Sequence, residues 1–204
     1  MKRALLALAI GTTLSVAAQA GPLYSNNFDG GALNGMTTAN SSTPGGTTSW
    51  FQGVPEIFAA QSGAADSYLA ANFNSAPAGG TISNMLSTGY LVTSGNVVLT
   101  FWAKGANDAG FEDHFKVDYE TLGGVKTMLA ADITAAADWT QYTYFLGTNG
   151  SGRFNITYFG AADASDYLGI DTLAVNVPEP SSVALMGVAL AGLVASRRKA
   201  GKKA

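Results

Sequence analysis

The side chains best suited to chemistry in this sequence are two carboxylates that lie two residues apart. Asp118 and Glu120 alternate with apolar residues in a stretch that also contains Lys116. Side chains at i and i+2 of a β-strand share a face, about 6.8 Å apart at Cα, a separation compatible with a glycosidase acid and base. Nothing nearby in the sequence would tune one of the two into an acid catalyst. We therefore expect a solvated strand face of mixed charge and no catalytic residue.

A second group of acidic residues falls in two loops. Calcium takes six to eight oxygen ligands from such loops, so a rim at which the two loops meet could hold a structural calcium ion. Acidic loops that only keep the protein soluble are the alternative. No other cofactor is expected. The candidate ligands are Asp108, Glu112, Asp113, Asp163 and Asp166, and Asn107 adds a neutral oxygen.

Aromatic residues are the candidates for contact with sugar rings. Trp50 follows a loop rich in Gly, Ser and Thr, so we expect it to be exposed and able to bind a ligand. We expect most of the other aromatic side chains to pack in the core. His114 is the only histidine and has no evident Ser or Cys partner, and the chain has no cysteine. Disulfides, thiol chemistry and cysteine-based metal sites are therefore excluded.

The net charge of −3 conceals a difference between the ends and the middle of the chain. Residues 21–176 contain 4 basic and 13 acidic residues, whereas the other 7 basic residues lie within residues 1–3 and 197–204. An acidic body repels phosphate backbones. We therefore expect no nucleic-acid partner.

The N-terminus has the parts of an export signal. Lys2 and Arg3 precede an apolar run at residues 4–14, and Ala18 and Ala20 form an A-x-A cleavage site. An apolar run of this length rises only about 16 Å as a helix, too short for a hydrocarbon core about 30 Å thick. We expect residues 1–20 to be a signal peptide that signal peptidase removes before Gly21.

The C-terminus has a second ordered set of features. Pro178, Glu179 and Pro180 lie in a motif at residues 177–182, followed by an apolar span at 183–196 and a basic end at 197–204. The prolines favour an extended segment that an enzyme can grip. The basic end should stay cytoplasmic, with the span as a transmembrane helix held transiently in the inner membrane. An ordinary single-pass tail anchor is the alternative.

This order of motif, span and basic end resembles the PEP-CTERM sorting domain of exported proteins in Gram-negative bacteria. The resemblance covers residues 177–204. It implies that an exosortase, a membrane transpeptidase-like enzyme, recognises Pro178, Glu179 and Pro180, and that the host makes exopolysaccharide. Both termini then place the middle domain outside the cytoplasm, in the cell envelope, on the outer surface or in the extracellular matrix.

The middle of the chain has the pattern of an all-β domain. The run at 97–103 is apolar enough for a strand covered on both faces, whereas 115–119 alternates and predicts one wet face. Residues 33–49 predict a long surface loop. At least seven strands without intervening helices favour one antiparallel β-sandwich over residues 21–176. The expected strands are 24–28, 67–73 (Ala-rich, with a helix as the alternative), 97–103, 115–119, 139–146, 153–158 and 167–176.

Six short segments are arranged as in choice-of-anchor J domains, a resemblance that spans about residues 24–176. It implies a jelly-roll-like sandwich akin to cleaved-adhesin domains and some carbohydrate-binding modules. It also implies a surface location, and it transfers no activity and no catalytic residue. The segments are FDGG at 28–31, WFQG at 50–53, FAAQSGAADSY at 58–68, GTISN at 80–84, LTFW at 99–102 and YLGIDT at 167–172.

Together these features predict a non-enzymatic exported protein of the cell envelope or matrix that binds exopolysaccharide or acts in adhesion and biofilm. Its expected partners are signal peptidase and exosortase during export, and extracellular polysaccharide afterwards. Two alternatives stay open. One is a purely structural surface protein without a small ligand, and the other is a glycan-active enzyme of the sandwich class.

Overall fold

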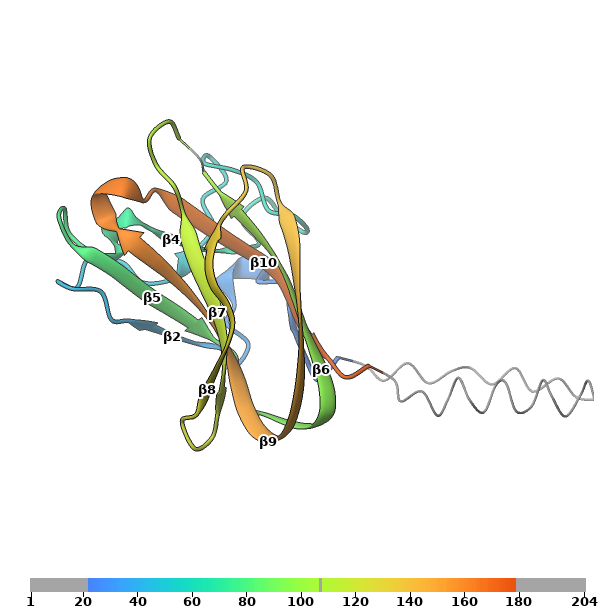
Figure 1. Cartoon of the computed structure of the whole chain (residues 1–204). Helices are drawn as coiled ribbons and strands as arrows, with labels where there is room; N and C mark the ends of the chain where they lie inside the picture. Colours follow the sequence, from blue (N-terminus) through green and yellow to red (C-terminus); the bar gives the residue numbers. More distant parts are fainter. Residues whose placement is uncertain (1–21, 107, 179–204) are drawn as a thin grey trace, which may run out of the picture.

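A computed structural model describes residues 22–106 and 108–178 of the chain. In this part, ten strands form one antiparallel sheet that curls into two layers (Figure 1). The only helices there are three short 3-10 turns, and none is long or apolar enough to cross a membrane. The predicted all-β sandwich is confirmed. The cleavage-site residues Ala18, Ala20 and Gly21, and the tail from Glu179 onward, lie outside the described residues.

The two layers share one strand. The first layer contains β2 (Thr37–Asn40), β5 (Thr81–Ser87), the second half of β9 (Thr140–Ala161), β7 (His114–Thr121) and β8 (Lys126–Thr134). The second contains the first half of β9, then β6 (Leu91–Gly105), β10 (Tyr167–Asn176), β4 (Leu69–Asn72) and β3 (Phe51–Gln52), with β1 (Tyr24–Asn26) beside the end of β10. The 3-10 turns are Asp29–Gly31, Phe73–Ser75 and Ala162–Ala164.

The larger of two clusters of buried hydrophobic residues lies between the layers. Because side chains alternate along a strand, every second residue of β6 and β7 points inward. The rings of Phe101 on β6 and Phe115 on β7 are 5.9 Å apart, and Tyr142 of β9 lies 5.1 Å from Phe115. These contacts join the two layers, and with no cysteine in the chain the core holds them together.

Strand β9 joins the layers by continuing through a glycine-rich bend. Gly152 pairs with Leu91 of β6 and also with Thr121 of β7, and Gly150 has φ of 104°. The sequence predicts two strands here, at 139–146 and 153–158, because the intervening glycines have the composition of a turn. That prediction is wrong in this respect. The glycines let one strand bend from one layer into the other.

Two other local predictions are also corrected. Residues 97–103 are buried on one face only, since Val98, Thr100 and Trp102 are half-buried. Residues 33–49 include strand β2, and the side chain of Asn40 anchors the segment by donating to the carbonyls of Thr48 and Ser75. Strand β10 has the predicted bounds and contains a bulge at Thr172, where φ is 46°. Residues 69–72 form the strand β4 and not a helix.

Replacing Gly152 by Ala should destabilise the protein by about 2–3 kcal/mol, because overpacking a full site costs energy of this order. A Cβ at Gly152 would overlap the ring and hydroxyl of Tyr119, whose side chain is buried. Urea denaturation of both proteins measures the change. Gly147→Ala is the matched control in the same strand, since its Cβ would meet only Asn96 Oδ1 at 3.4 Å. Equal stability of the two variants would contradict the assigned role of Gly152.

Candidate ligand-binding face

The outer face of the first layer carries a continuous double row of polar and aromatic side chains. It arises because β7 and the second half of β9 pair with their outward residues directly opposite one another. The inward residues of the same strands are apolar and buried. The four outward pairs are Glu120 with Arg153, Asp118 with Asn155, Lys116 with Thr157, and His114 with Phe159.

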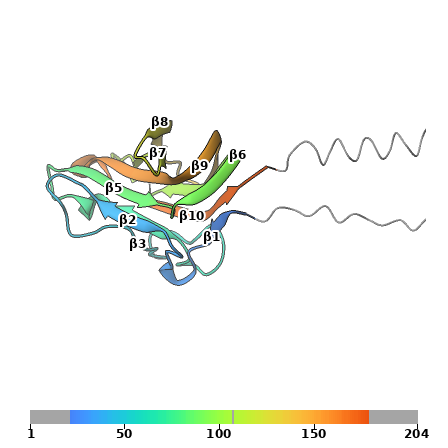
Figure 2. The ribbon, with the colours of Figure 1, turned by 90° about the horizontal axis from the view of Figure 1, so that it is seen from below.

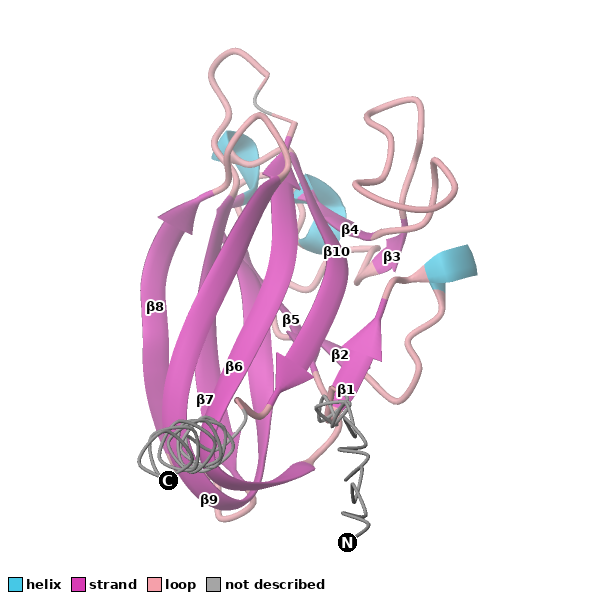
Figure 3. Ribbon diagram, turned by 90° about the vertical axis from the view of Figure 1, so that its right-hand side faces the viewer, coloured by secondary structure: helices cyan, strands magenta, loops and turns pink. Residues whose placement is uncertain are grey.

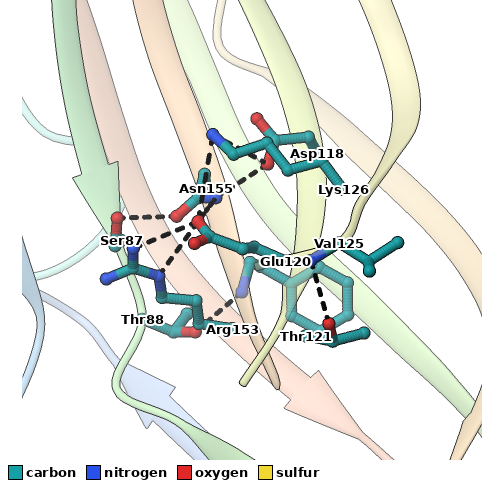
Figure 4. A network of polar contacts seen from close by, with 10 residues as sticks. Ser87, Thr88, Asp118, Glu120, Thr121, Val125, Lys126, Arg153 and Asn155 are labelled. Atoms are coloured by element: carbon teal, nitrogen blue, oxygen red, sulfur yellow. Dashed lines mark hydrogen bonds and ion pairs between the residues drawn. The ribbon is translucent and has the colours of Figure 1, made fainter. Parts of the chain in front are cut away.

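One end of this face is a hydrogen-bond network around Asn155 (Figure 4). The Asn155 amide donates to Asp118 Oδ1 at 2.7 Å and to Glu120 Oε2 at 3.3 Å. Its carbonyl oxygen accepts from the Ser87 hydroxyl at 2.7 Å. Asn155 is fully buried, and Asp118 nearly so. The network is therefore held rigid although it lies on the outer side of the sheet.

Two cations compensate the carboxylates of this network. Arg153 Nη2 lies 3.1 Å from Glu120 Oε2, and Lys126 Nζ lies 3.8 Å from Glu120 and 4.0 Å from Asp118. Burial opposes ionisation of Glu120, but the hydrogen bonds from Arg153 and Asn155 and the nearby positive charges outweigh it. The pKa of Glu120 therefore lies below its usual value.

This arrangement is the reverse of what an acid catalyst needs. A glycosidase acid must keep its proton near neutral pH, whereas Glu120 is held in the ionised form by its partners. Asp118 and Glu120 share a face as predicted. Because both contact Asn155 and Lys126, they act as acceptors within a closed network.

The other end of the face opens into a pocket of about 510 Å³. His114 lies in it between two carboxylates, with Nδ1 2.8 Å from Asp132 Oδ1 and Nε2 3.4 Å from Glu112 Oε2. Phe159 contributes an aromatic wall, and Lys116 Nζ lies 5.5 Å from the centre of its ring. An apolar ring surrounded by a few hydrogen-bonding groups is the composition of a small-ligand site.

The two acidic loops meet beside this pocket. The Glu112 amide donates to the Ala164 carbonyl at 2.9 Å, and the Asp166 amide donates to Asp113 Oδ1 at 2.9 Å. Asp113 is fully buried, and Oδ2 of Asp113 and of Asp166 has no hydrogen-bond partner among the described residues. A second pocket of about 430 Å³ adjoins the first and includes Asp166 and Phe111 in its lining.

The five predicted calcium ligands are not gathered around one point. Glu112 contacts His114, and Asp163 accepts a hydrogen bond from the Gly79 amide. Among the described residues, no three His, Asp or Glu side chains are placed to hold a metal ion. Asp113 and Asp166, with Asp108 beside them, offer fewer oxygens than the six to eight that calcium takes. The described residues, which exclude the candidate Asn107, do not complete a calcium site.

Trp50 does not form the exposed sugar-stacking surface that the sequence predicts. Its side chain is only 8% exposed, and its indole Nε1 donates to the Asn84 carbonyl at 3.2 Å. The prediction of exposure is wrong because the preceding loop is anchored by Asn40 and brings Trp50 into the core.

The sequence analysis missed three residues that matter most for the face: Asn155, Asp132 and Phe159. Asn155 and Phe159 alternate with the buried residues of β9, and that parity could have placed them outward. Asp132 could not be placed, because the pairing of β7 with β8 contains two register shifts.

The comparisons with known proteins agree with the fold and with the tail. Residues 176–199 match the PEP-CTERM protein-sorting motif, so the chain carries a sorting signal of exported, envelope-directed proteins. No curated protein matches the chain in sequence.

Solved structures define the class of fold. The K3 cleaved adhesin domain of Lys-gingipain from Porphyromonas gingivalis W83 aligns with a TM-score of 0.59 and 18% identity, covering 76% of this chain and 96% of that one. The CBM22-1 xylan-binding domain of Paenibacillus barcinonensis Xyn10C aligns at 0.50 and 18%, covering 78% and 97%. TmCBM61, solved with β-1,4-galactotriose, aligns at 0.50 and 12%, covering 74% and 94%. The described domain has the fold of cleaved adhesins and carbohydrate-binding modules.

Replacing Asp166 by Asn should remove a pH dependence of stability. Burial, together with Asp108 and Asp113, raises the pKa of Asp166 to about 6. The folded state then binds the proton more tightly than the unfolded state, so wild-type stability falls as pH rises from about 4 to about 6. At pH 7 the variant should be more stable by about 1 kcal/mol, a value reduced for solvent screening.

Thermal unfolding between about pH 4 and pH 7 measures this effect. Asp138→Asn, at an exposed position, is the control and should follow the wild-type profile. The same scans with calcium or with a chelator test calcium binding at Asp113 and Asp166. The raised pKa of Asp166 would be contradicted if the stability of the wild type rose with pH over this window and the stability of the Asp166 variant rose equally.

Proposed function

We propose that this protein is a non-enzymatic component of the cell envelope or extracellular matrix that binds extracellular polysaccharide through the outer face of its first layer. The observation that carries the proposal is the 510 Å³ pocket, in which the Phe159 ring lies beside the polar groups of His114, Glu112 and Asp132. A sugar ring has an apolar face and hydroxyl edges. A pocket of this composition complements both.

The polar row beyond the pocket suits a chain of sugars rather than a single one. It continues from Phe159 and Lys116 through Thr157 to the Asn155 network. At the far end, Tyr90 is partly exposed, and the Arg153 guanidinium lies 5.2 Å from the centre of its ring. A polymer lying along this row would meet an aromatic ring at each end and hydrogen-bonding groups between them.

One observation supports binding without catalysis, and the class of fold is compatible with it. The pair of carboxylates that the sequence singles out, Asp118 and Glu120, is occupied by Asn155, Lys126 and Arg153. In addition, the structural neighbours are an adhesin domain, a xylan-binding domain and a module crystallised with a galactotriose. The ligands of these neighbours are not assigned to this chain, because a likeness at under 25% identity supports the fold alone.

The route to the outside completes the proposal. Signal peptidase removes residues 1–20 by cleavage between Ala20 and Gly21, and residues 21–176 fold as the sandwich. An exosortase then recognises Pro178, Glu179 and Pro180 while residues 183–196 cross the inner membrane of a Gram-negative bacterium. Strand β10 ends at Asn176 and Val177 packs against the core, so the motif begins where the domain ends.

Replacing Phe159 by Ala should weaken polysaccharide binding about tenfold, because an aromatic contact is worth roughly 1 kcal/mol beyond its buried area. Affinity electrophoresis of the full chain in gels containing xylan, β-1,4-galactan or the host exopolysaccharide measures the effect, with and without calcium. Ile57→Ala, an exposed apolar position in a loop outside this face, is the control and should bind as the wild type does.

Three outcomes separate the alternatives. Retardation that is lost in the Phe159 variant supports the proposal. No retardation of the wild type by any of these polymers, with or without calcium, contradicts it and favours a purely structural surface protein. New reducing ends in the polymer after incubation would show a glycan-active enzyme instead.

A further inference from the structure

The first half of β9 is a long strand edge without a partner among the described residues. Residues 140–150 pair with β6 on one side, whereas β5 and β7 flank only the second half of the strand and the Ser151 carbonyl accepts from the Leu122 amide. Figure 3 faces the layer that contains this part of β9 together with β6 and β10. The backbone N–H and C=O groups on the outer side of this segment can therefore pair with another strand.

The other edges are protected in the ways that natural proteins use, except at residues 91–97 of β6, where β9 is the only partner among the described residues. Strands β1, β2 and β3 have only 3, 4 and 2 residues. Strand β8 carries Lys126 and Asp132, and its pairing with β7 has two register shifts. Short length, charge and bulges all discourage pairing of an edge with a further strand.

The edge of β9 has none of these protections. Between Asp138 and Arg153 the sequence contains no charged residue and no proline. Near the middle of the segment, Phe145 is 74% exposed, although a large aromatic side chain is normally covered. A long, uncharged strand edge with an exposed aromatic residue is a site for strand addition.

We propose that two copies of this chain associate by antiparallel pairing of residues 140–150 of β9. The pairing is symmetric about Phe145, so Phe145 of each copy lies opposite Phe145 of the other, and Gln141 lies opposite Asn149. The two second layers then form one continuous sheet. Antiparallel pairing of identical edges is a two-fold interface, which is the commonest arrangement of homo-oligomers.

Charge favours a second copy as the occupant. The body of the chain is acidic, so two copies repel each other over most of their surfaces. The edge of β9 is uncharged along the whole paired segment.

The proposal is independent of polysaccharide binding. The paired edge belongs to the second layer, and the candidate face is the outer side of the first. Pairing therefore leaves both candidate faces of a dimer open.

Cysteine cross-linking in the full chain tests the pairing directly, because the natural sequence contains no cysteine. Phe145→Cys should form a disulfide-linked dimer on mild oxidation, since residues opposite each other across an antiparallel pair have Cβ atoms about 5 Å apart. Val92→Cys is the control: Val92 is 75% exposed, but it lies on β6, outside the proposed paired segment. The Phe145 variant should cross-link at least about tenfold faster.

Two further measurements establish the register and the equilibrium. A mixture of Gln141→Cys and Asn149→Cys chains should give the mixed dimer in preference to either homodimer. Analytical ultracentrifugation of the wild type and of Thr143→Lys, both without cysteine and in the same detergent, measures the equilibrium. The wild type should have the mass of two chains and the Thr143 variant the mass of one chain. The circular dichroism spectra of the two proteins should be the same. Equal cross-linking at positions 145 and 92, or a single-chain mass for the wild type, would overturn the proposal.

Discussion

The whole structure depends on one strand, β9, that belongs to both layers of the sandwich. Its 22 residues pair with β6 in one layer and with β5 and β7 in the other, and the change takes place at Gly152. A residue with a side chain at this point would collide with the buried ring of Tyr119. Since the chain has no disulfide, this backbone continuity and the core between the layers keep the two sheets in register.

The same constraint builds the candidate face. As β9 enters the first layer it brings Arg153, Asn155 and Phe159 onto the outer side, opposite the charged side chains of β7. Glu120 is stabilised as an anion by its partners, and this is why the face is suited to holding hydroxyl groups and poorly suited to donating a proton. A rigid, fully paired network also costs little further ordering when a ligand binds.

The sequence predicts the structure correctly where a local pattern of residue types has one physical explanation. Alternation predicts the buried Phe115, Val117 and Tyr119, and the proline-containing motif and its basic end predict the sorting signal that the family match confirms. The sequence does not predict the structure correctly where contacts between residues distant in the chain determine the conformation or exposure of a residue. The glycines of β9 have the composition of a turn, Trp50 follows a polar loop that is anchored by distant carbonyls, and Asp132 faces His114 only because of register shifts.

The course of β10 has a mechanical consequence. Tyr167 directly follows the loop beside the pockets, and Pro178 comes two residues after the strand ends at Asn176, beside β1 (Figure 2). Ten residues of strand separate these points by roughly 30 Å. A force between a captured polymer and a C-terminal attachment would therefore run along β10. Such a load shears all of its ladder bonds to β6, β4 and β1 together, whereas a crosswise pull would unzip them one by one.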